Sequence, residues 1–434
     1  MTKRFQYLVV ICSTCLLAVL LLGTVLGRGA AADGDAYKHF SVFGEVVAKI
    51  KGEYVEEPNM HNVALGALNG LLESLDPYAS YLSADQYKQY QKSIADPQGD
   101  VGLLLSRRSG YIGVVDALAG SPADKAGITT FDIVEAINGI STRDMPLAYA
   151  GVLLKGAPGS SVELSVIRVR RGAEAQKVSL TRERLTPAPV AAGMLAGDIG
   201  HLRIPSLVQG KAAEAAARLA DLQKQGARKL VLDLRDNGGG PPEEGIALAR
   251  LFLEQGLVGY LQGQKVPKEE FRAEPSKVVW KQPVVVLVNR GTAGGSEVAA
   301  AALLENKRAE VVGERTYGEA ALRKALTLDD GSAVILAVAK YHAPGGKAIQ
   351  DTGVTPTLSI SEPEPAIDPD DETQAPPAPE PPKPSKDVQL EKAVEVLTKG
   401  LEEAKKASAP ASAGRSGPEP AAPQGPLNVP RPPR

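Results

Sequence analysis

Residues 291–297, Gly-Thr-Ala-Gly-Gly-Ser-Glu, lie between two apolar segments of different character. The preceding residues 284–288 (VVVLV) predict a buried strand, and residues 298–304 (VAAAALL) predict a helix. The small residues between them predict a tight turn that a ligand can approach closely, with helix N–H groups pointing into the gap. Strand–turn–helix junctions of this kind often hold a reactive side chain, yet the central position here is Gly294.

Strands and helices alternate around this junction from residue 186 to residue 360. Residues 230–234 (LVLDL) predict a second buried strand that runs into a glycine turn at 238–240, and an alanine-rich helix is predicted near residues 211–225. Further strands are predicted near 309–313 and 329–341. This alternation is typical of an α/β core.

Two other units precede the core. The apolar spacing of residues 36–96 predicts helices, with a break at Asp76-Pro77 and a helix cap at residues 83–85. We interpret this region as a helical cap or dimerisation arm. From residue 97 to residue 185, short strands separated by glycine turns predict a β-domain.

The two ends of the chain have distinct compositions. Lys3 and Arg4 precede an apolar segment at residues 7–26, and small residues follow it, so residues 1–32 are predicted to be a signal peptide or membrane anchor. The length of the apolar segment favours an uncleaved anchor over cleavage after Ala32. In either case the rest of the chain is expected on the periplasmic side of the cell envelope, anchored to the inner membrane or exported and soluble.

Residues 361–434 hold about half of the prolines of the chain, together with alanine and charged residues. This composition predicts a disordered, extended tail. Within it, apolar residues at helical spacing predict one short amphipathic helix at 387–406 that docks on the body or on a second subunit.

Charge and cysteine content limit the classes of partner. The chain of 434 residues has a formal net charge of −2 at pH 7, so nothing favours nucleic acid as a partner. Both cysteines, Cys12 and Cys15, lie in the first apolar segment, which leaves no disulfide or thiolate chemistry to the folded part. No cofactor and no metal site is predicted.

Residues 97–185 resemble a PDZ domain of the bacterial protease type. Residues 121–128 (SPADKAGI) and 132–139 (DIVEAING) carry this resemblance, although Thr130-Phe131 replaces the Pro-Gly that usually precedes the second motif. The resemblance implies a loop whose successive N–H groups hold the carboxylate of a peptide C-terminus while the peptide adds to the sheet as an edge strand. The residues of this loop are Gly99, Asp100, Val101, Gly102 and Leu103. A plain glycine turn is the alternative.

Residues 186–360 resemble the carboxyl-terminal processing, or tail-specific, proteases, which are serine peptidases of family S41. Four motifs carry the resemblance: residues 232–240 (LDLRDNGGG), 291–297 (GTAGGSE), 311–323 (VVGERTYGEAALR) and 341–346 (YHAPGG). The three units come in the order of this family, so the resemblance covers about residues 36–360. It implies a multidomain α+β fold with a helical arm, a PDZ β-domain, an α/β core related to ClpP and crotonase, and the disordered tail.

The resemblance also implies where the catalytic groups of the family would lie. The family uses a serine nucleophile, a desolvated lysine as general base and a glutamine that orients the lysine. On this chain these positions fall at Gly294, Glu319 and Arg323, with the family's spacing between nucleophile and base preserved. All three chemical groups are therefore expected to be missing, while Gly240 and Gly295 occupy the oxyanion positions.

Nearby side chains offer little substitute chemistry. Ser296 is the nearest hydroxyl, but residues i and i+2 of a helix point about 200° apart, so it is expected to face away from the site. Glu319 is a weak base for an alkoxide at its usual pKa, and Arg323 on the same strand face is expected to pair with it. Lys324 is expected to face elsewhere by strand alternation, and the four histidines show no Ser/His/Asp arrangement.

The sequence therefore predicts an exported pseudoprotease of this family. It is expected to bind polypeptide C-termini or unfolded segments through the PDZ loop, and to act as an adaptor or regulator with an active relative or a second copy of itself. Two alternatives stay open. One is an active serine endopeptidase that cleaves near protein C-termini with displaced chemistry, and the other is an envelope scaffold that acts through the proline-rich tail.

Overall fold

The computed structural model describes residues 34–95, 99–108, 110–143, 145–168, 174–361 and 386–408. Contacts divide the chain into one unit up to Leu72 and a second from Glu73 onwards. The first unit contains α2 (Gly34–Glu53) and most of α3 (Met60–Glu73). No helix in the described ranges is long and apolar enough to cross a membrane. The predicted anchor at residues 7–26 lies outside these ranges, as do tail residues 362–385 and 409–434.

The helices predicted within residues 36–96 are separated at the break expected after Asp76-Pro77, where the structure adds a short strand. Residues after the Asp76-Pro77 break form the strand β1 (Ser80–Leu82), which pairs antiparallel with β16 (Ala333–His342). Leu82 is fully buried there, so a partner strand far along the chain decides the local structure. The predicted helix α4 (Ala84–Ala95) follows, and Ser83 caps it because Ser83 and Gln86 each donate a backbone N–H to the side chain of the other.

An antiparallel sheet forms the body of residues 99–183. Its strands lie in the order β2-β3-β4-β6-β7, with β5 paired to β4, so β2 is an edge strand. Two helices lie in the connections, and α6 packs against β2. The elements are β2 (Leu103–Arg108), β3 (Tyr111–Ala117), α5 (Pro122–Lys125), β4 (Ile133–Ile137), β5 (Ile140–Ser141), α6 (Leu147–Leu154), β6 (Ser161–Ile167) and β7 (Ala175–Thr181).

A mostly parallel six-stranded sheet forms the centre of the core. The strands lie in the order β17-β14-β13-β10-β9-β8, and only β8 runs antiparallel to its neighbour. The strands are β8 (Ala191–Met194), β9 (Ile199–Arg203), β10 (Lys229–Asp233), β13 (Val284–Val288), β14 (Glu310–Gly313) and β17 (Leu358–Ser359). The helices are α7 (Lys211–Lys224), α8 (Pro242–Arg250) and α9 (Gly295–Glu305).

A second sheet of the core joins distant parts of the chain. It runs in the order β1-β16-β11-β12, and β15 also pairs with β16. Its remaining members are β11 (Leu257–Gln262), β12 (Glu269–Arg272) and β15 (Ala321–Thr327), with a short 3-10 helix, η2 (Pro275–Lys277), after β12. In this sheet, β16 pairs both with β15, which follows Glu319, and with β1, which comes from the N-terminal part of the chain.

The central strand β13 is buried on both faces. Val284, Val286 and Val288 belong to the apolar cluster that includes α7, α8 and α9, whereas Val285 and Leu287 belong to the cluster with the C-terminal helices. Successive side chains of a strand point to opposite faces, so an uninterrupted valine run predicts such two-sided burial. The core is therefore complete only with its C-terminal helices.

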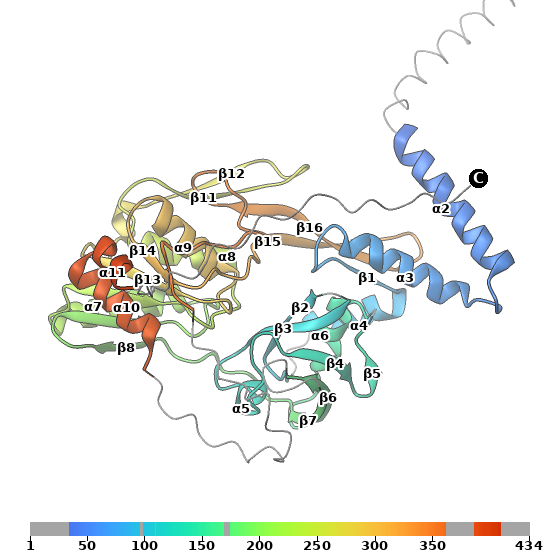
Figure 1. Ribbon diagram of the computed structural model, residues 1–434, viewed down its shortest axis with the longest axis horizontal. Helices are drawn as coiled ribbons and strands as arrows, with labels where there is room; N and C mark the ends of the chain where they lie inside the picture. The colour runs from blue at the N-terminus through green and yellow to red at the C-terminus, as the bar shows by residue number, and fades with distance from the viewer. Residues whose placement is uncertain are drawn as a thin grey trace, which may run out of the picture. The chain divides into compact units, whose positions relative to one another are not determined.

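Residues 386–408 dock on the body of the same chain, beside β13 and β14 (Figure 1). The single helix predicted at 387–406 is wrong, because Gly400 with φ +92° separates α10 (Val388–Lys399) from α11 (Leu401–Ser408). An ion pair between the buried Arg235 and the partly exposed Asp387 anchors α10. The guanidinium of Arg235 bonds Asp233 on one side, at 2.7 and 2.9 Å, and Asp387 on the other, at 2.8 and 2.9 Å.

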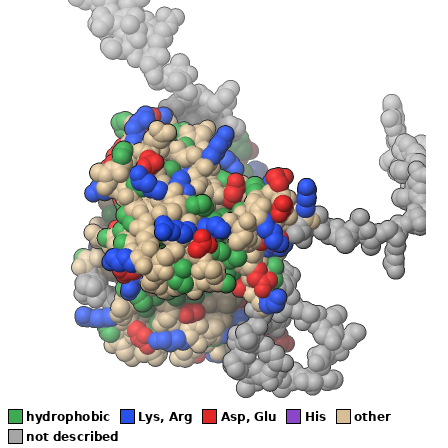
Figure 2. Space-filling view, turned by 90° about the vertical axis from the view of Figure 1, so that its left-hand side faces the viewer, with side chains coloured by type: hydrophobic (Ala, Val, Ile, Leu, Met, Phe, Trp, Pro, Cys, Tyr) green, Lys and Arg blue, Asp and Glu red, His purple; other side chains and the backbone are tan. Residues whose placement is uncertain are grey.

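The surface on the side of α10 and α11 carries a mixture of positively and negatively charged side chains. Figure 2 shows Lys and Arg side chains interspersed with Asp and Glu side chains across the face that it draws. Opposite charges also pair within α10 and α11, for example Lys392 with Glu395 at 2.7 Å and Lys405 with Glu402 at 3.2 Å. Because the Lys405–Glu402 pair lies largely in water, it contributes little to stability.

We predict that Asp387→Ala loosens the C-terminal helices. The change removes two charge-assisted hydrogen bonds from Arg235, which should lower the free energy of docking by about 1–3 kcal/mol. Hydrogen exchange of residues 388–408 measures this as faster exchange confined to α10 and α11. The matched control is Lys386→Ala, whose exposed pair with Glu391 is expected to contribute almost nothing. Equal exchange in Asp387→Ala and the control would show that the Asp387–Arg235 pair does not hold these helices in place.

Candidate functional site

Gly294 lies at the junction of β13 and α9. Its φ of +65° and ψ of −129° are conformations that glycine adopts readily and other residues rarely adopt. A Cβ placed on Gly294 would lie 3.2 Å from the carbonyl oxygen of Gly240 and 3.9 Å from that of Glu319. The position predicted to hold the nucleophile of the family therefore faces the glycine turn and the position predicted to hold the base.

The buried carboxylate of Glu297 joins these segments. Its Oε2 accepts the N–H of Gly294 at 3.2 Å and the N–H of Glu319 at 2.7 Å. Its Oε1 accepts the N–H of Gly318 at 2.7 Å and the hydroxyl of Thr316. Burial raises the pKa of Glu297 to about 7, while these hydrogen bonds act in the opposite direction. One side chain thus fixes the first turn of α9 against the segment that leads into β15.

A second set of hydrogen bonds joins the turns that follow β10 and β13. The amide of Asn289 donates to Asp236 Oδ1 at 2.7 Å, and the N–H of Asp236 donates to Asn289 Oδ1 at 3.0 Å. In addition, the N–H of Ala293 donates to the carbonyl of Asn237 at 3.0 Å. These reciprocal bonds hold the glycine turn 238–240 beside Gly294.

Glu319 and Arg323 form an ion pair. Arg323 Nη1 lies 2.9 Å from Glu319 Oε1, and the side chains are only 22% and 16% exposed, so the pairing expected from their spacing is present. The guanidinium of Arg323 also lies 4.1 Å from the centre of the Tyr78 ring. Burial raises the pKa of Glu319, and Arg323 acts against that shift. Lys324 is exposed, as strand alternation predicts.

One cavity of about 190 Å³ brings the predicted positions together. Gly294, Glu319, Arg323 and Gly240 all line it, with the remaining lining from Leu104, Gly238, Gly239, Pro242, Ala320 and Ala321. None of these residues carries a hydroxyl, thiol or amine. In the described part of the chain, no group of three or more His, Cys, Asp or Glu side chains is arranged to hold a metal ion.

Gly295 and Ser296 do not line this cavity. Gly295 is packed against the backbone of Pro241 and Gly245, where an added Cβ would meet the Pro241 carbonyl at 2.7 Å. Ser296 is fully buried in α9, and its Oγ has no hydrogen-bond partner among the described residues. The direction expected for Ser296 from helix geometry therefore agrees with its position.

The predicted carboxylate loop is filled by its own side chain. Asp100 Oδ1 accepts the N–H of Val101 at 2.6 Å and the N–H of Gly102 at 3.0 Å. Gly102 has a φ of +81°, which presents its N–H in the same direction as that of Val101. Gly99 exchanges backbone hydrogen bonds with Gly156, and Leu103 begins the edge strand β2. A bound carboxylate would have to replace that of Asp100.

Sequence reasoning missed a contact between the β-domain and the core. Asp116 at the end of β3 is only 3% exposed, and its Oδ2 accepts the N–H of Gly238 at 3.0 Å. Burial raises the pKa of Asp116 to about 7. The tyrosine hydroxyl of Tyr317 also donates to Ser106 of β2. An acidic residue within the apolar segment 112–117 was the available signal for this contact.

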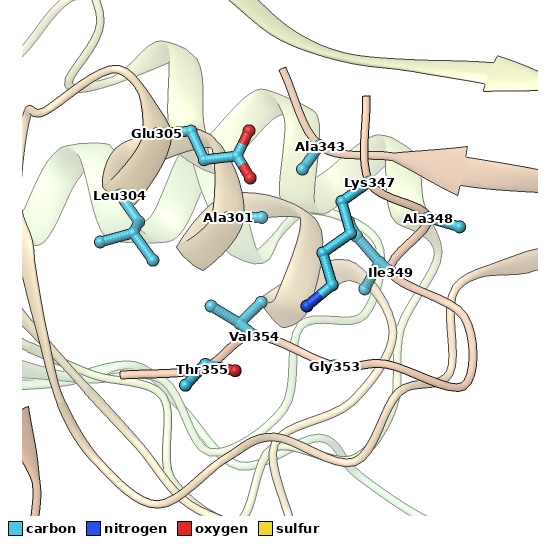
Figure 3. A pocket seen from close by; sticks show the side chains of 10 residues that line it. All are labelled: Ala301, Leu304, Glu305, Ala343, Lys347, Ala348, Ile349, Gly353, Val354 and Thr355. Atoms are coloured by element: carbon cyan, nitrogen blue, oxygen red, sulfur yellow. The ribbon is translucent and has the colours of Figure 1, made fainter. Parts of the chain in front are cut away.

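A smaller cavity of about 160 Å³ lies at the other end of α9. Figure 3 shows Ala301, Leu304 and Glu305 of α9 on one side of it and Lys347 with its neighbours on the other. Its lining is mostly apolar and includes none of the predicted site residues. It is therefore separate from the site around Gly294.

Comparison with known proteins agrees with this architecture. The model of peptidase family S41 matches residues 198–360, and a PDZ domain model matches residues 113–168. The carboxy-terminal processing protease CtpA of Bacillus subtilis is 33% identical over 360 residues, which cover 82% of this chain and 76% of that protein. The chain belongs to the carboxyl-terminal processing proteases of family S41. The prediction of a multidomain α+β fold with a PDZ domain and a core of this family is confirmed.

Other carboxyl-terminal processing proteases show similar agreement. That of Synechocystis is 32% identical over 323 residues, which cover 72% of this chain and 75% of the relative. The solved structure of the photosystem II D1 C-terminal processing protease has a TM-score of 0.62 at 28% identity, with 74% of this chain and 86% of that chain covered. The PDZ domain and core of the present chain are therefore those of the family.

We predict that stability falls with pH through Asp116. Its folded-state pKa of about 7 lies above the ordinary value of 3.8, so the folded state binds this proton more tightly than the unfolded state. That contribution is complete below the ordinary pKa and is lost as the pH rises to about 7. Asp116→Asn keeps an acceptor for Gly238 and removes the charge. It should raise the free energy of unfolding at about pH 8 by about 2–4 kcal/mol relative to the wild type, and change it little at about pH 4.

Urea unfolding over this pH range makes the measurement. The exposed Asp85, changed to Asn, is the control and should leave the pH dependence unaltered. If Asp116→Asn retains the full wild-type decrease, the buried carboxyl of Asp116 does not titrate between these pH values and the prediction fails.

Proposed function

We propose that this chain is a pseudoprotease of the carboxyl-terminal processing family that binds polypeptide C-termini and acts as an adaptor or regulator. The observation that carries this proposal is the composition of the cavity around Gly294. Where the family places a serine and a lysine, this cavity holds a glycine and the ion pair of Glu319 with Arg323. What is proposed here is that the chain no longer hydrolyses peptides. Its membership of the family does not depend on this proposal.

Chemical reasoning favours loss of hydrolysis over displaced catalysis. Acyl transfer to the enzyme needs a nucleophile within reach of both a base and an oxyanion site. The lining of the cavity contains no such nucleophile, and the hydroxyl of Ser296 is buried outside it. Burial raises the pKa of Glu319, but its ion pair with Arg323 acts against that shift and engages the carboxylate.

Retained features support a binding role. The edge strand β2 has α6 beside it, which is the arrangement through which PDZ domains add a peptide as an extra strand. We further propose that residues 7–26 anchor the chain in the inner membrane with its folded part in the periplasm. There it would present captured chain ends to an active relative or to a second copy of itself.

Restoring the catalytic groups tests the loss of hydrolysis. The wild type should leave an unfolded reporter protein with a free apolar C-terminus intact. The triple variant Gly294→Ser, Glu319→Lys, Arg323→Gln should degrade it, because the backbone frame is retained. The serine at φ +65° is expected to lower the free energy of unfolding by about 1–3 kcal/mol. Product formation followed by gel electrophoresis makes the measurement.

The matched control is the double variant Glu319→Lys, Arg323→Gln, which keeps Gly294 and should stay inactive. Cleavage by the wild type that disappears in Ser296→Ala would overturn the proposal and assign the nucleophile to Ser296. Cleavage by the wild type that persists in Ser296→Ala would equally refute loss of hydrolysis.

Binding at the PDZ loop is tested through Asp100. Asp100→Ala frees the N–H groups of Val101 and Gly102 and removes a like charge, so a peptide with a free C-terminal carboxylate should bind about tenfold more tightly. Fluorescence anisotropy of a labelled apolar peptide makes the measurement. The amidated form of the same peptide is the control and should not gain affinity. An unchanged affinity for the free carboxylate would exclude this loop as the binding site.

A further inference from the structure

A cleft of about 330 Å³ lies between the PDZ domain and the core, apart from the predicted carboxylate loop. Its walls include three aromatic residues, Tyr78, Phe131 and Tyr317, and two arginines, Arg290 and Arg315. Phe131 comes from the PDZ domain and the arginines from the core. Arg290 and Arg315 reach water at the rim, which makes the cleft accessible to a ligand.

Phe131 occupies a backbone conformation that suits glycine. Its φ is +78°, and a bulky residue at positive φ is strained. It stands where the related PDZ domains usually have the glycine of Pro-Gly, so the sequence departs from the pattern at a position where glycine would relieve strain. Strained residues persist where their side chain has a role, and they gather at binding and catalytic sites. The ring of Phe131 is held by Arg290, whose guanidinium carbon lies 5.4 Å from the ring centre.

Of the two arginines at the cleft, Arg290 has an acidic partner, whereas Arg315 has none in the described ranges. Arg290 pairs with Glu314 at 3.2 Å, and Asp351 pairs with Lys340 at 2.9 Å. Arg315 donates to two backbone carbonyls, those of Thr352 at 2.7 Å and Asp351 at 3.2 Å. No carboxylate lies within ion-pair distance of Arg315 in the described ranges. Its Nη1 group remains available for an anion at the rim.

We propose that this cleft binds a polypeptide segment in which a carboxylate lies beside an apolar side chain. The aromatic walls would cover the apolar side chain, and the Arg315 guanidinium would bind the carboxylate. This proposal goes beyond the proposed function, because the cleft uses no residue of the loop at Gly99–Leu103. The carboxylate can come from the end of a chain or from an internal Asp or Glu, and the experiment separates these two sources.

The position of the cleft links it to the altered catalytic cavity. Tyr78 lines the cleft, and its ring lies against Arg323, which lines the cavity. Gly318 lines the cleft and the next residue, Glu319, lines the cavity. A segment held at the cleft would therefore lie next to the place where a member of this family performs its chemistry.

Phe131→Gly separates binding from stability. Removing the ring relieves the strained φ, so the midpoint of thermal unfolding should rise or stay unchanged. The affinity for a short labelled peptide that ends in an apolar residue with a free carboxylate should fall about tenfold, because an aromatic contact is lost. Lys307→Gly is the matched control. It relieves a φ of +55° at an exposed position outside the cleft and should leave peptide affinity unchanged.

Arg315→Gln tests the charge. Its amide nitrogen lies where Arg315 has Nε, so it retains a donor for the carbonyl of Thr352 while the positive charge is removed, and the free-carboxylate peptide should bind about tenfold more weakly. An amidated peptide should then bind wild type and variant equally. A second amidated peptide, with an internal Glu beside the apolar residue, identifies the source. If it loses affinity with Arg315→Gln, the cleft accepts internal acids, and if it does not bind, the cleft is specific for chain ends.

The result is distinguishable from binding at the PDZ loop. If the loop alone binds the peptide, Asp100→Ala changes the affinity while Phe131→Gly and Arg315→Gln do not, and the inference is overturned. If the cleft binds independently, the loss caused by Phe131→Gly persists in the Asp100→Ala background. A Phe131→Gly protein that unfolds at a lower temperature and keeps its peptide affinity would assign Phe131 to domain packing and refute the inference.

Discussion

The buried carboxylate of Glu297 is the constraint on which the rest of the site depends. It accepts hydrogen bonds from three backbone N–H groups and one hydroxyl, and each would be left buried without a partner if the carboxylate were lost. A buried donor without a partner costs about 1–3 kcal/mol, so this set is a large fraction of the stability of a domain. Glu297 binds the backbone, not the side chains, of Gly294 and Glu319. The frame therefore does not depend on the side chains at these two positions, which is compatible with the proposed loss of the catalytic groups.

Electrostatics explains why Glu319 and Arg323 occur together. A single charge at either position would be poorly hydrated, because both side chains are mostly buried. The pair neutralises itself, and the Tyr78 ring covers the guanidinium. A lysine and a glutamine at these positions would avoid a buried charge, because the lysine amine would be neutral and the glutamine amide is uncharged. The Glu319–Arg323 pair and a lysine with a glutamine are therefore both compatible with the same backbone, and neither leaves an isolated charge buried in the cavity.

Much of this arrangement could be predicted from the sequence, because it depends on neighbours along the chain. The β13–α9 junction follows from the valine run and its small residues, and the pairing of Glu319 with Arg323 follows from their spacing. Contacts between distant segments could not be predicted. Nothing local marks Tyr78 as the partner of Arg323, and the strand at Ser80–Leu82 exists because β16 offers it an edge.

Two positions differ, in opposite directions, from the glycine pattern that the family resemblance implies. At Gly294 glycine stands where the family has a serine, and the positive φ of that junction is therefore free of strain. At Phe131 an aromatic residue stands where related PDZ domains have glycine, and the positive φ there carries strain. A chain that merely accumulated tolerated changes would be expected to relax at both places. Relaxation at Gly294 with strain at Phe131 is what the proposed function requires, namely binding that is kept without hydrolysis.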